Sequence, residues 1–86
     1  MYTESAVVRD EVGLHARPAS KFVKLAGMFQ SEITLRKEGG AAAANGKSIT
    51  SILLMGAPRG ATVQITADGP DEVEACRALR ELLEHE

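Results

Sequence analysis

Apolar and polar positions alternate along several segments of the chain, and this pattern predicts β-strands. Residues 2–9 contain a short apolar run, whereas apolar and polar side chains alternate in residues 31–36 and 61–67. Alternation directs one set of side chains to each face of a sheet. Residues 41–44 are alanines, which favour a short helix as readily as a weak edge strand. We take this segment as a strand in the expected order, with the helical alternative left open.

Apolar residues at helical spacing occupy the segments between and after these strands. A first helix is expected from Ala16 and weakens at Gly27. A second, short helix is expected after Ser48, a possible N-cap, and ends at Gly56. A third begins near Pro70, which suits a first helical turn. Its apolar stripe comprises Val73, Cys76, Leu79, Leu82 and Leu83.

The predicted order of elements is therefore β-α-β-β-α-β-α, which is an α+β arrangement. Strands that are apolar on one side only imply a sheet with one face in water and helices packed on the other. We expect a two-layer, open-faced β-sandwich. The chain has 86 residues, which is enough for one domain and too few for two. Residues 1–86 are expected to form that single domain.

Composition and charge narrow the classes of function. The net charge of −2 gives no reason to expect binding to nucleic acid. The longest uncharged stretch, residues 48–58, is too short to cross a bilayer, and the charged N-terminal segment does not resemble a signal peptide. Cys76 is the sole cysteine, so no internal disulfide can form. We expect a cytoplasmic protein without membrane insertion.

The candidate chemistry lies in residues 13–20, where His15 stands at the start of the first expected helix. The N–H groups that follow, of Ala16 and Arg17, have no helical partner and form an anion site at the positive end of the helix dipole. The Arg17 guanidinium adds a positive charge and forked donors. Pro18 fits because a first-turn residue needs no N–H bond. A neutral imidazole here can attack phosphorus. A helix-start histidine without any chemistry is the alternative interpretation.

The segment Gly-Leu-His-Ala-Arg-Pro-Ala at residues 13–19 resembles the active-site motif of HPr, the histidine-containing phosphocarrier family of the phosphoenolpyruvate-dependent sugar phosphotransferase system. The similarity extends over essentially the whole chain and includes Phe22-Val23, residues 31–34, Lys47-Ser48 and Gly56. It implies an antiparallel four-stranded sheet covered on one face by three helices. The chain departs from many relatives at Val12, where they have a polar residue. It also departs in the segment 41–46, which has more residues here than in many relatives.

The resemblance also implies a function for individual residues. His15 would be phosphorylated at Nδ1 by phosphorylated enzyme I and would pass the phosphoryl group to the IIA domains of sugar permeases, with Arg17 stabilising the phosphate. The protein would then be a carrier and not an enzyme, with no cofactor and no metal site. The alternative is a regulatory binding module that has an HPr-like surface and no part in sugar transport.

Lys47-Ser48 admits three interpretations. By resemblance, Ser48 matches the serine that a dedicated HPr kinase/phosphorylase modifies in many Gram-positive bacteria, and a helix start tolerates the added charge. The plain alternative is an N-cap serine. Residues 46–48 also resemble the end of a P-loop, but five residues separate Gly40 from Gly46 where that motif requires four. ATP binding is therefore disfavoured.

Basic and apolar side chains near His15 suggest where partner proteins dock. Arg17, Lys21 and Lys24 share one side of the first helix, a row that ordinarily marks a solvated face but can steer acidic partners. The second helix has more apolar residues than one buried stripe needs. We expect one interface, used in turn by donor and acceptor proteins, and a monomeric carrier. Besides Lys21 and Lys24, its docking residues would be Lys47, Ile49, Leu53 and Leu54.

Overall fold

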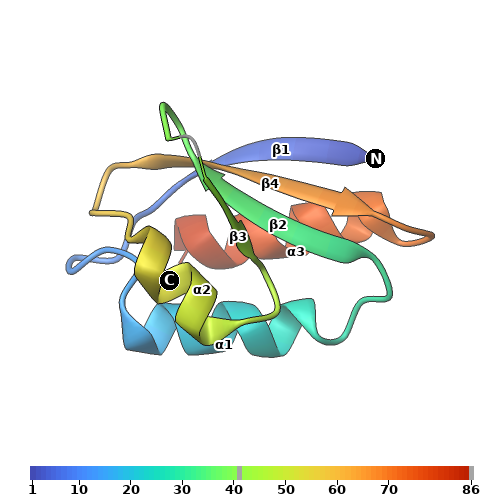
Figure 1. Cartoon of the computed structure of the whole chain (residues 1–86), viewed down its shortest axis with the longest axis horizontal. Helices are drawn as coiled ribbons and strands as arrows, with labels where there is room; N and C mark the ends of the chain where they lie inside the picture. Colours follow the sequence, from blue (N-terminus) through green and yellow to red (C-terminus); the bar gives the residue numbers. More distant parts are fainter. Residues whose placement is uncertain (41, 86) are drawn as a thin grey trace.

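The structure is a computed structural model that describes residues 1–40 and 42–85, and its element order is the predicted one (Figure 1). The strands are β1 (Tyr2–Val7), β2 (Glu32–Lys37), β3 (Ala43–Asn45) and β4 (Thr62–Asp68). The helices are α1 (Ala16–Ala26), α2 (Ile49–Met55) and α3 (Glu72–His85). The predicted bounds of the strands differ from these by one or two residues at their ends.

The four strands form one antiparallel sheet in the order β1-β4-β2-β3. Strand β4 lies inside the sheet, with Val63 opposite Ala6 of β1 and Ile65 opposite Leu35 of β2. All three helices cover the same face of this sheet (Figure 1). The architecture is the expected open-faced β-sandwich.

Burial follows the alternation seen in the sequence. In β4, Val63, Ile65 and Ala67 are completely buried, whereas the side chains between them are partly exposed. Burying such aliphatic side chains is the main favourable contribution to folding of a domain this small. The helices contribute further buried residues to the same core, among them Ala19, Phe22, Ile52, Ala75, Cys76 and Leu79. Cys76 is therefore part of the core, as expected.

The alanine-rich segment contributes a strand and not a helix. Residues 43–45 pair with β2, and Ala44 lies opposite Leu35 and is only 2% exposed. Pairing with β2 gives the backbone N–H and C=O groups of β3 hydrogen-bond partners and buries Ala44. Together these effects outweigh the helical preference of alanine. Residue 41 lies outside the described residues, and the greater length of residues 41–46 relative to many family members stays a prediction.

The start of α3 differs from the prediction, because Pro70 lies in the turn before the helix and not in its first turn. Gly69 packs so closely against Ser31 that a Cβ atom at Gly69 would lie 2.6 Å from the Ser31 Cα atom. The Asp71 carboxylate then accepts hydrogen bonds from the backbone N–H groups of Gln30 and Ser31 and from the Ser31 hydroxyl. These contacts hold residues 69–71 against the start of β2, so that the helix begins only at Glu72.

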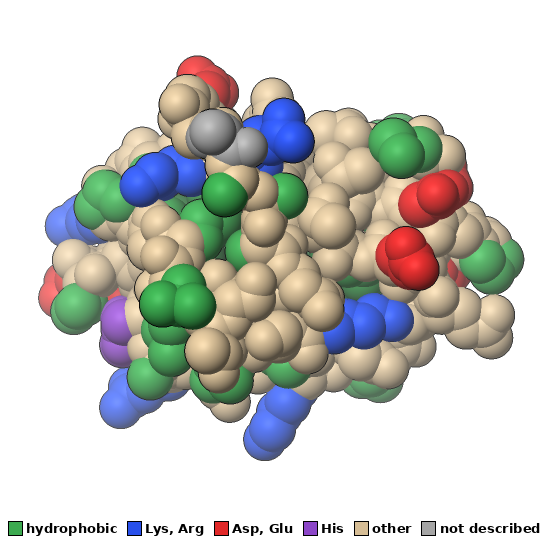
Figure 2. All heavy atoms as spheres, in the orientation of Figure 1, with side chains coloured by type: hydrophobic (Ala, Val, Ile, Leu, Met, Phe, Trp, Pro, Cys, Tyr) green, Lys and Arg blue, Asp and Glu red, His purple; other side chains and the backbone are tan. Residues whose placement is uncertain are grey.

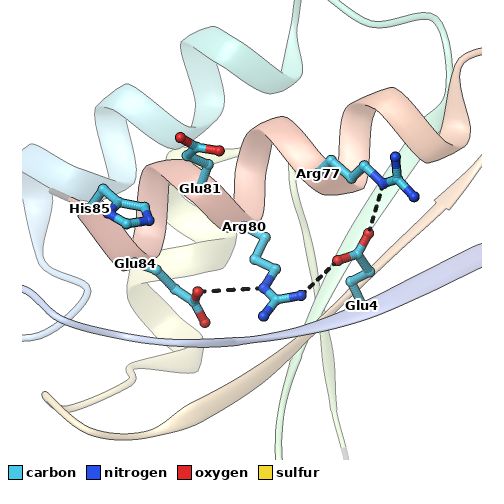
Figure 3. Close-up of a pocket in the computed structure, with 6 residues that line it drawn as sticks. All are labelled: Glu4, Arg77, Arg80, Glu81, Glu84 and His85. Carbon is cyan, nitrogen blue, oxygen red and sulfur yellow. Dashed lines mark hydrogen bonds and ion pairs between the residues drawn. The ribbon is translucent and has the colours of Figure 1, made fainter.

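Charged side chains join α3 to β1 on the side of the molecule shown in Figure 3. Glu4 of β1 lies 3.0 Å from Nη1 of Arg80 and 3.8 Å from Nε of Arg77, and Arg80 also pairs with Glu84 (Figure 3). The Glu4 side chain is only 13% exposed.

No helix in the described part of the chain combines the length and apolar character that a membrane crossing requires.

Candidate functional site

His15 occupies the N-cap position of α1, as the sequence predicts. Its backbone is extended, with φ −97° and ψ −164°, and its carbonyl accepts the N–H of Ala19 at 2.9 Å, the first hydrogen bond of the helix. The imidazole makes no capping hydrogen bond to the helix, and the side chain is 38% exposed. The ring is therefore accessible to a partner protein at the start of α1.

The loop before His15 is fixed by a close contact with the segment after α2. Gly13 has φ +89°, and a Cβ atom there would lie 2.6 Å from the carbonyl oxygen of Ala57 and 2.9 Å from the Cα atom of Pro58. The next residue, Leu14, is buried and donates its N–H to the same Ala57 carbonyl at 2.8 Å. Only glycine fits this position, so Gly13 permits the close contact that holds the loop before His15.

The loop also brings a carboxylate to the histidine. Oδ1 of Asp10 lies 3.1 Å from Nε2 of His15 and accepts the backbone N–H of Val12 at 3.0 Å. The Val12 N–H is the main cause that lowers the pKa of the Asp10 carboxyl. Desolvation, the next largest effect, opposes it, and the hydrogen bond with His15 lowers the pKa further. Asp10 is thus an ionised hydrogen-bond acceptor at neutral pH.

The backbone that follows His15 has the geometry of an anion site. Ala16 and Arg17 are the first two residues of α1, so their N–H groups have no acceptor within the helix, and the third residue, Pro18, has no N–H. The positive end of the helix dipole adds to the attraction of an anion. Arg17 is exposed and lines the same open depression of 470 Å³ as Asp10 and His15. The geometry suits a negatively charged group beside the imidazole.

Exposed apolar and basic side chains lie on α1 and on α2, which pack against each other. Figure 2 shows hydrophobic side chains gathered over α2, next to a histidine, with basic side chains along the edge formed by α1. The exposed fractions are 38% for Ile49, 42% for Leu53 and 83% for Leu54. Val12, in the loop before His15, is 73% exposed and adds to the apolar surface. The predicted basic residues of α1, Lys21 and Lys24, are also exposed.

Lys47 and Ser48 lie at the other end of α2 from His15. The Lys47 ammonium group donates to the carbonyl of Phe29, just beyond the C-terminus of α1, whereas the segment after α2 contacts the His15 loop at Gly13. The seven residues of α2 span about 10 Å along its axis. Ser48 is the N-cap of this helix and accepts the N–H of Ser51 at 3.2 Å. The C-terminal end of α2, with Leu53 and Leu54, is therefore the end nearer to the His15 loop, and Lys47 and Ser48 lie at the other end. The Leu54 side chain itself lines a depression next to Ala43 and Ala44 of β3.

The surroundings of Gly46 do not fit a P-loop. A Cβ atom at Gly46 would lie 2.5 Å from Cγ2 of Ile33, so this backbone packs on β2. Because Lys47 bonds to Phe29 and the Ser48 hydroxyl caps α2, neither side chain points to a phosphate cradle. Within residues 1–40 and 42–85, no group of three or more His, Cys, Asp or Glu side chains is arranged to hold a metal ion.

Asp10 is the site residue that sequence reasoning missed. It lies five residues before His15, directly after the segment 2–9 that the sequence predicts as a strand, and no motif marks it. The contact depends on the Gly13 turn, in which the Gly13 N–H also donates to the Asp10 carbonyl at 2.9 Å. A carboxylate before a glycine-containing turn that leads to the candidate histidine is the one signal that could have suggested it.

Comparison with known proteins agrees with this fold. The family model PTS-HPr, described as the PTS HPr component phosphorylation site, matches residues 2–85. The phosphocarrier protein HPr of Neisseria meningitidis serogroup A is 37% identical over 83 residues, covering 96% of this chain and 91% of the relative.

Solved structures of two HPr forms from Thermoanaerobacter tengcongensis are also similar to the chain. The crystal structure of HPr-C-His matches with a TM-score of 0.88 at 38% identity, covering 96% of this chain and 91% of the other. The crystal structure of an HPr dimer matches with a TM-score of 0.72 at 39% identity, covering 95% and 92%. Fold and sequence together define the class as phosphocarrier proteins of the phosphotransferase system. The chain belongs to the HPr family, which confirms the resemblance seen in the sequence.

Proposed function

We propose that the chain accepts a phosphoryl group on His15 from phosphorylated enzyme I and donates it to the IIA domains of sugar permeases. The observation that supports this proposal best is the exposed imidazole of His15 at the N-cap of α1, beside the free N–H groups of Ala16 and Arg17. Family membership supports the carrier role. The chain acts as a carrier with a phosphohistidine intermediate and turns over no small molecule by itself.

The chemistry follows from the charges around the ring. Nδ1 of His15 attacks the phosphorus, and the N–H groups of Ala16 and Arg17 together with the Arg17 guanidinium stabilise the negative oxygens of the phosphoryl group. A phosphoryl group on an imidazole nitrogen is readily transferred onward because the nitrogen is a good leaving group. The same site thereby serves acceptance and donation.

The direct test is phosphorylation with enzyme I and phosphoenolpyruvate, read by intact mass. We expect one acid-labile phosphate on the parent chain and none on the His15→Ala variant. Circular dichroism of both proteins verifies that they are folded. A folded parent chain that gains no phosphate from a competent enzyme I of the same organism would refute the proposal and leave a regulatory binding module.

Donor and acceptor proteins dock in turn on the surface around His15. Its basic part is Lys21 and Lys24 of α1, and its apolar part is Ile49, Leu53 and Leu54 of α2. Exposed apolar residues rimmed by basic ones suit partner surfaces that are apolar at the centre and acidic at the edge. Lys47 was predicted to belong to this surface, but its ammonium group bonds to Phe29 at the far end of α2. Because this bond occupies one donor of its ammonium group, Lys47 adds less to docking than a lysine whose ammonium group stays in water.

Two substitutions test this docking surface. Lys24→Glu and Leu54→Ala should each lower the second-order rate of phosphoryl transfer from enzyme I by about tenfold, the effect of losing about 1.4 kcal/mol of binding free energy. Met28→Ala is the matched control for Leu54→Ala, because Met28 is 79% exposed at the opposite end of α1. Unchanged rates for both substitutions would place the interface elsewhere.

Ser48 is the site of regulatory phosphorylation by an HPr kinase/phosphorylase. Its hydroxyl is at the start of α2, where added negative charge is tolerated by the helix, and the apolar residues that follow would lose affinity for a partner. Incubation with such a kinase and ATP should give an acid-stable phosphate on the parent and none on Ser48→Ala. Equal labelling of the two proteins would leave Ser48 as a helix cap only.

The protein acts in the cytoplasm as a monomer made of one HPr domain, residues 1–86. A carrier that docks with several proteins through one surface needs that surface free. The dimer seen for the HPr of Thermoanaerobacter tengcongensis makes the oligomeric state a necessary measurement. Light scattering at micromolar concentration should give the mass of one chain, 9.1 kDa, and twice that mass would contradict this part of the proposal.

A further inference from the structure

The contact between Asp10 and His15 defines which imidazole nitrogen is available for reaction. Oδ1 of Asp10 lies 3.1 Å from Nε2 of His15 and at the same time 3.0 Å from the Val12 backbone nitrogen. The Val12 N–H is a donor, so Oδ1 is an acceptor in this arrangement. A hydrogen bond at the observed Nε2 distance therefore requires that Nε2 has the proton. In a neutral ring, the lone pair is then on Nδ1.

We propose that Asp10 is a positioning residue for phosphoryl transfer, which holds the proton of His15 on Nε2 and so presents Nδ1 as the nucleophile. The proposal rests on the proposed function, because it assigns a role within phosphorylation of His15. The carboxylate does not touch the phosphoryl group and acts through the imidazole. It is held by the Val12 N–H, in the loop that the close contact at Gly13 keeps in place.

The proposed step needs no proton transfer in either direction. The Nδ1 lone pair forms a bond to phosphorus, the bond between phosphorus and the donor protein breaks, and its electron pair stays with the donor. Nε2 keeps its proton, so the phosphorylated ring has a positive charge, and the adjacent Asp10 carboxylate balances it. In onward transfer the N–P bond breaks and its electrons return to Nδ1. The neutral ring is restored with Nε2 still protonated.

Three substitutions separate this role from a structural one. Asp10→Ala removes both hydrogen bonds of the side chain, whereas Asp10→Asn keeps an oxygen that can accept from Val12 and His15 but loses the charge. Glu38→Gln gives the same change in net charge as Asp10→Asn, in an exposed turn after β2. All proteins are made with His85→Gln, which removes the other of the two histidines. Every signal from an imidazole then belongs to His15.

The first readout is the tautomer of His15, from long-range ¹H–¹⁵N correlation spectra at a pH of about 8.5, where an ordinary histidine with a pKa of about 6.5 is neutral. We expect the Nε2–H form in the parent chain, in Asp10→Asn and in Glu38→Gln, and a mixture of forms in Asp10→Ala. The second readout is the rate of phosphorylation by enzyme I. It should fall about tenfold in Asp10→Ala, less in Asp10→Asn, and stay unchanged in Glu38→Gln.

Several results would overturn the role of Asp10. They are a parent chain with the proton on Nδ1, an Asp10→Ala variant that keeps the parent tautomer, and a changed tautomer with an unchanged phosphorylation rate. Failure of the proposed function is distinguishable, because the parent chain would then gain no phosphate at all while the spectra still report the tautomer. Unchanged signals from core residues in Asp10→Ala verify that the fold is kept.

Discussion

At the residue scale, the site depends on a position that has no side chain. Gly13 combines φ +89° with backbone atoms of the segment after α2 at 2.6 and 2.9 Å from the place of a Cβ atom. Gly13→Ala therefore meets both an unfavourable backbone conformation and a clash that backbone atoms cannot relieve by rotating. We expect it to lower the free energy of unfolding by more than about 2 kcal/mol, measured by urea denaturation.

Gly39 provides the matched control for Gly13→Ala. It has a similar φ of +82°, but a Cβ atom there would have no heavy atom within 4 Å. Gly39→Ala should therefore lower the free energy of unfolding by about 1 kcal/mol, the cost of the unfavourable backbone conformation without a clash. Equal losses of stability in the two variants would show that the contact with residues 57 and 58 does not restrict the loop.

The sequence places the candidate residues His15, Ala16 and Arg17 at a helix start, as the structure has them, but it does not predict the carboxylate beside His15. His15, Ala16 and Arg17 are consecutive, and a helix start imposes the direction of their N–H groups wherever it occurs. Asp10 reaches His15 only because the chain turns at Gly13, and the contact of Gly13 with Ala57 joins residues far apart in the sequence. Local spacing contains no information about such a contact.

At the element scale, α2 is short and depends on its cap. It has seven residues, and the Ser48 hydroxyl accepts the N–H of Ser51 at its start. Ser48→Ala should lower the free energy of unfolding by about 1 kcal/mol, whereas Ser48→Asp keeps an acceptor and a favourable charge at the helix start and should lower it less. Thermal or urea unfolding measures both. A Ser48→Ala variant as stable as the parent would show that the cap contributes nothing.

The strands and helices were predictable where the period of apolar residues was clear. The alternation in β2 and β4 specifies one buried face in each strand. The predicted stripe of α3 is buried at Cys76, Leu79 and Leu83, whereas Val73 is 37% exposed. Residues 41–44 were ambiguous because alanine favours helices and this segment has no alternation. Its strand in residues 43–45 exists through pairing with β2, a long-range contact that local preference does not report. The start of α3 at Glu72 depends likewise on the contact of Asp71 with residues 30 and 31.

At the scale of the whole molecule, carboxylates join segments that are distant in the sequence. Glu4 of β1 pairs with Arg80 of α3, and Glu84 of α3 accepts the backbone N–H of Val7 at the end of β1 (Figure 3 shows the first pair). Asp71 joins the start of α3 to the start of β2. The positions of these acidic residues along the sequence do not show which segments they join.

These paired carboxylates make the fold sensitive to acid. The pKa of Glu4 is lowered mainly by Arg80, that of Asp71 by the Ser31 hydroxyl, and that of Glu84 by the Val7 N–H. Because the same groups titrate at ordinary values, about 4, in the unfolded chain, the unfolded state binds more protons in the acidic range. The stabilising contribution is complete above those values and is lost as the pH falls through the lower pKa values of the folded state.

The midpoint of urea unfolding should therefore fall steadily between a pH of about 5 and a pH of about 2. Glu4→Gln removes one of these groups, so that its midpoint is lower at neutral pH and declines less on acidification than the midpoint of the parent chain. Glu38→Gln, in an exposed turn, controls for the change in net charge and should decline like the parent. If Glu4→Gln and Glu38→Gln declined alike, the ion pair of Glu4 with Arg80 would make no pH-dependent contribution, and the acid sensitivity would come from the other paired carboxylates, Asp71 and Glu84.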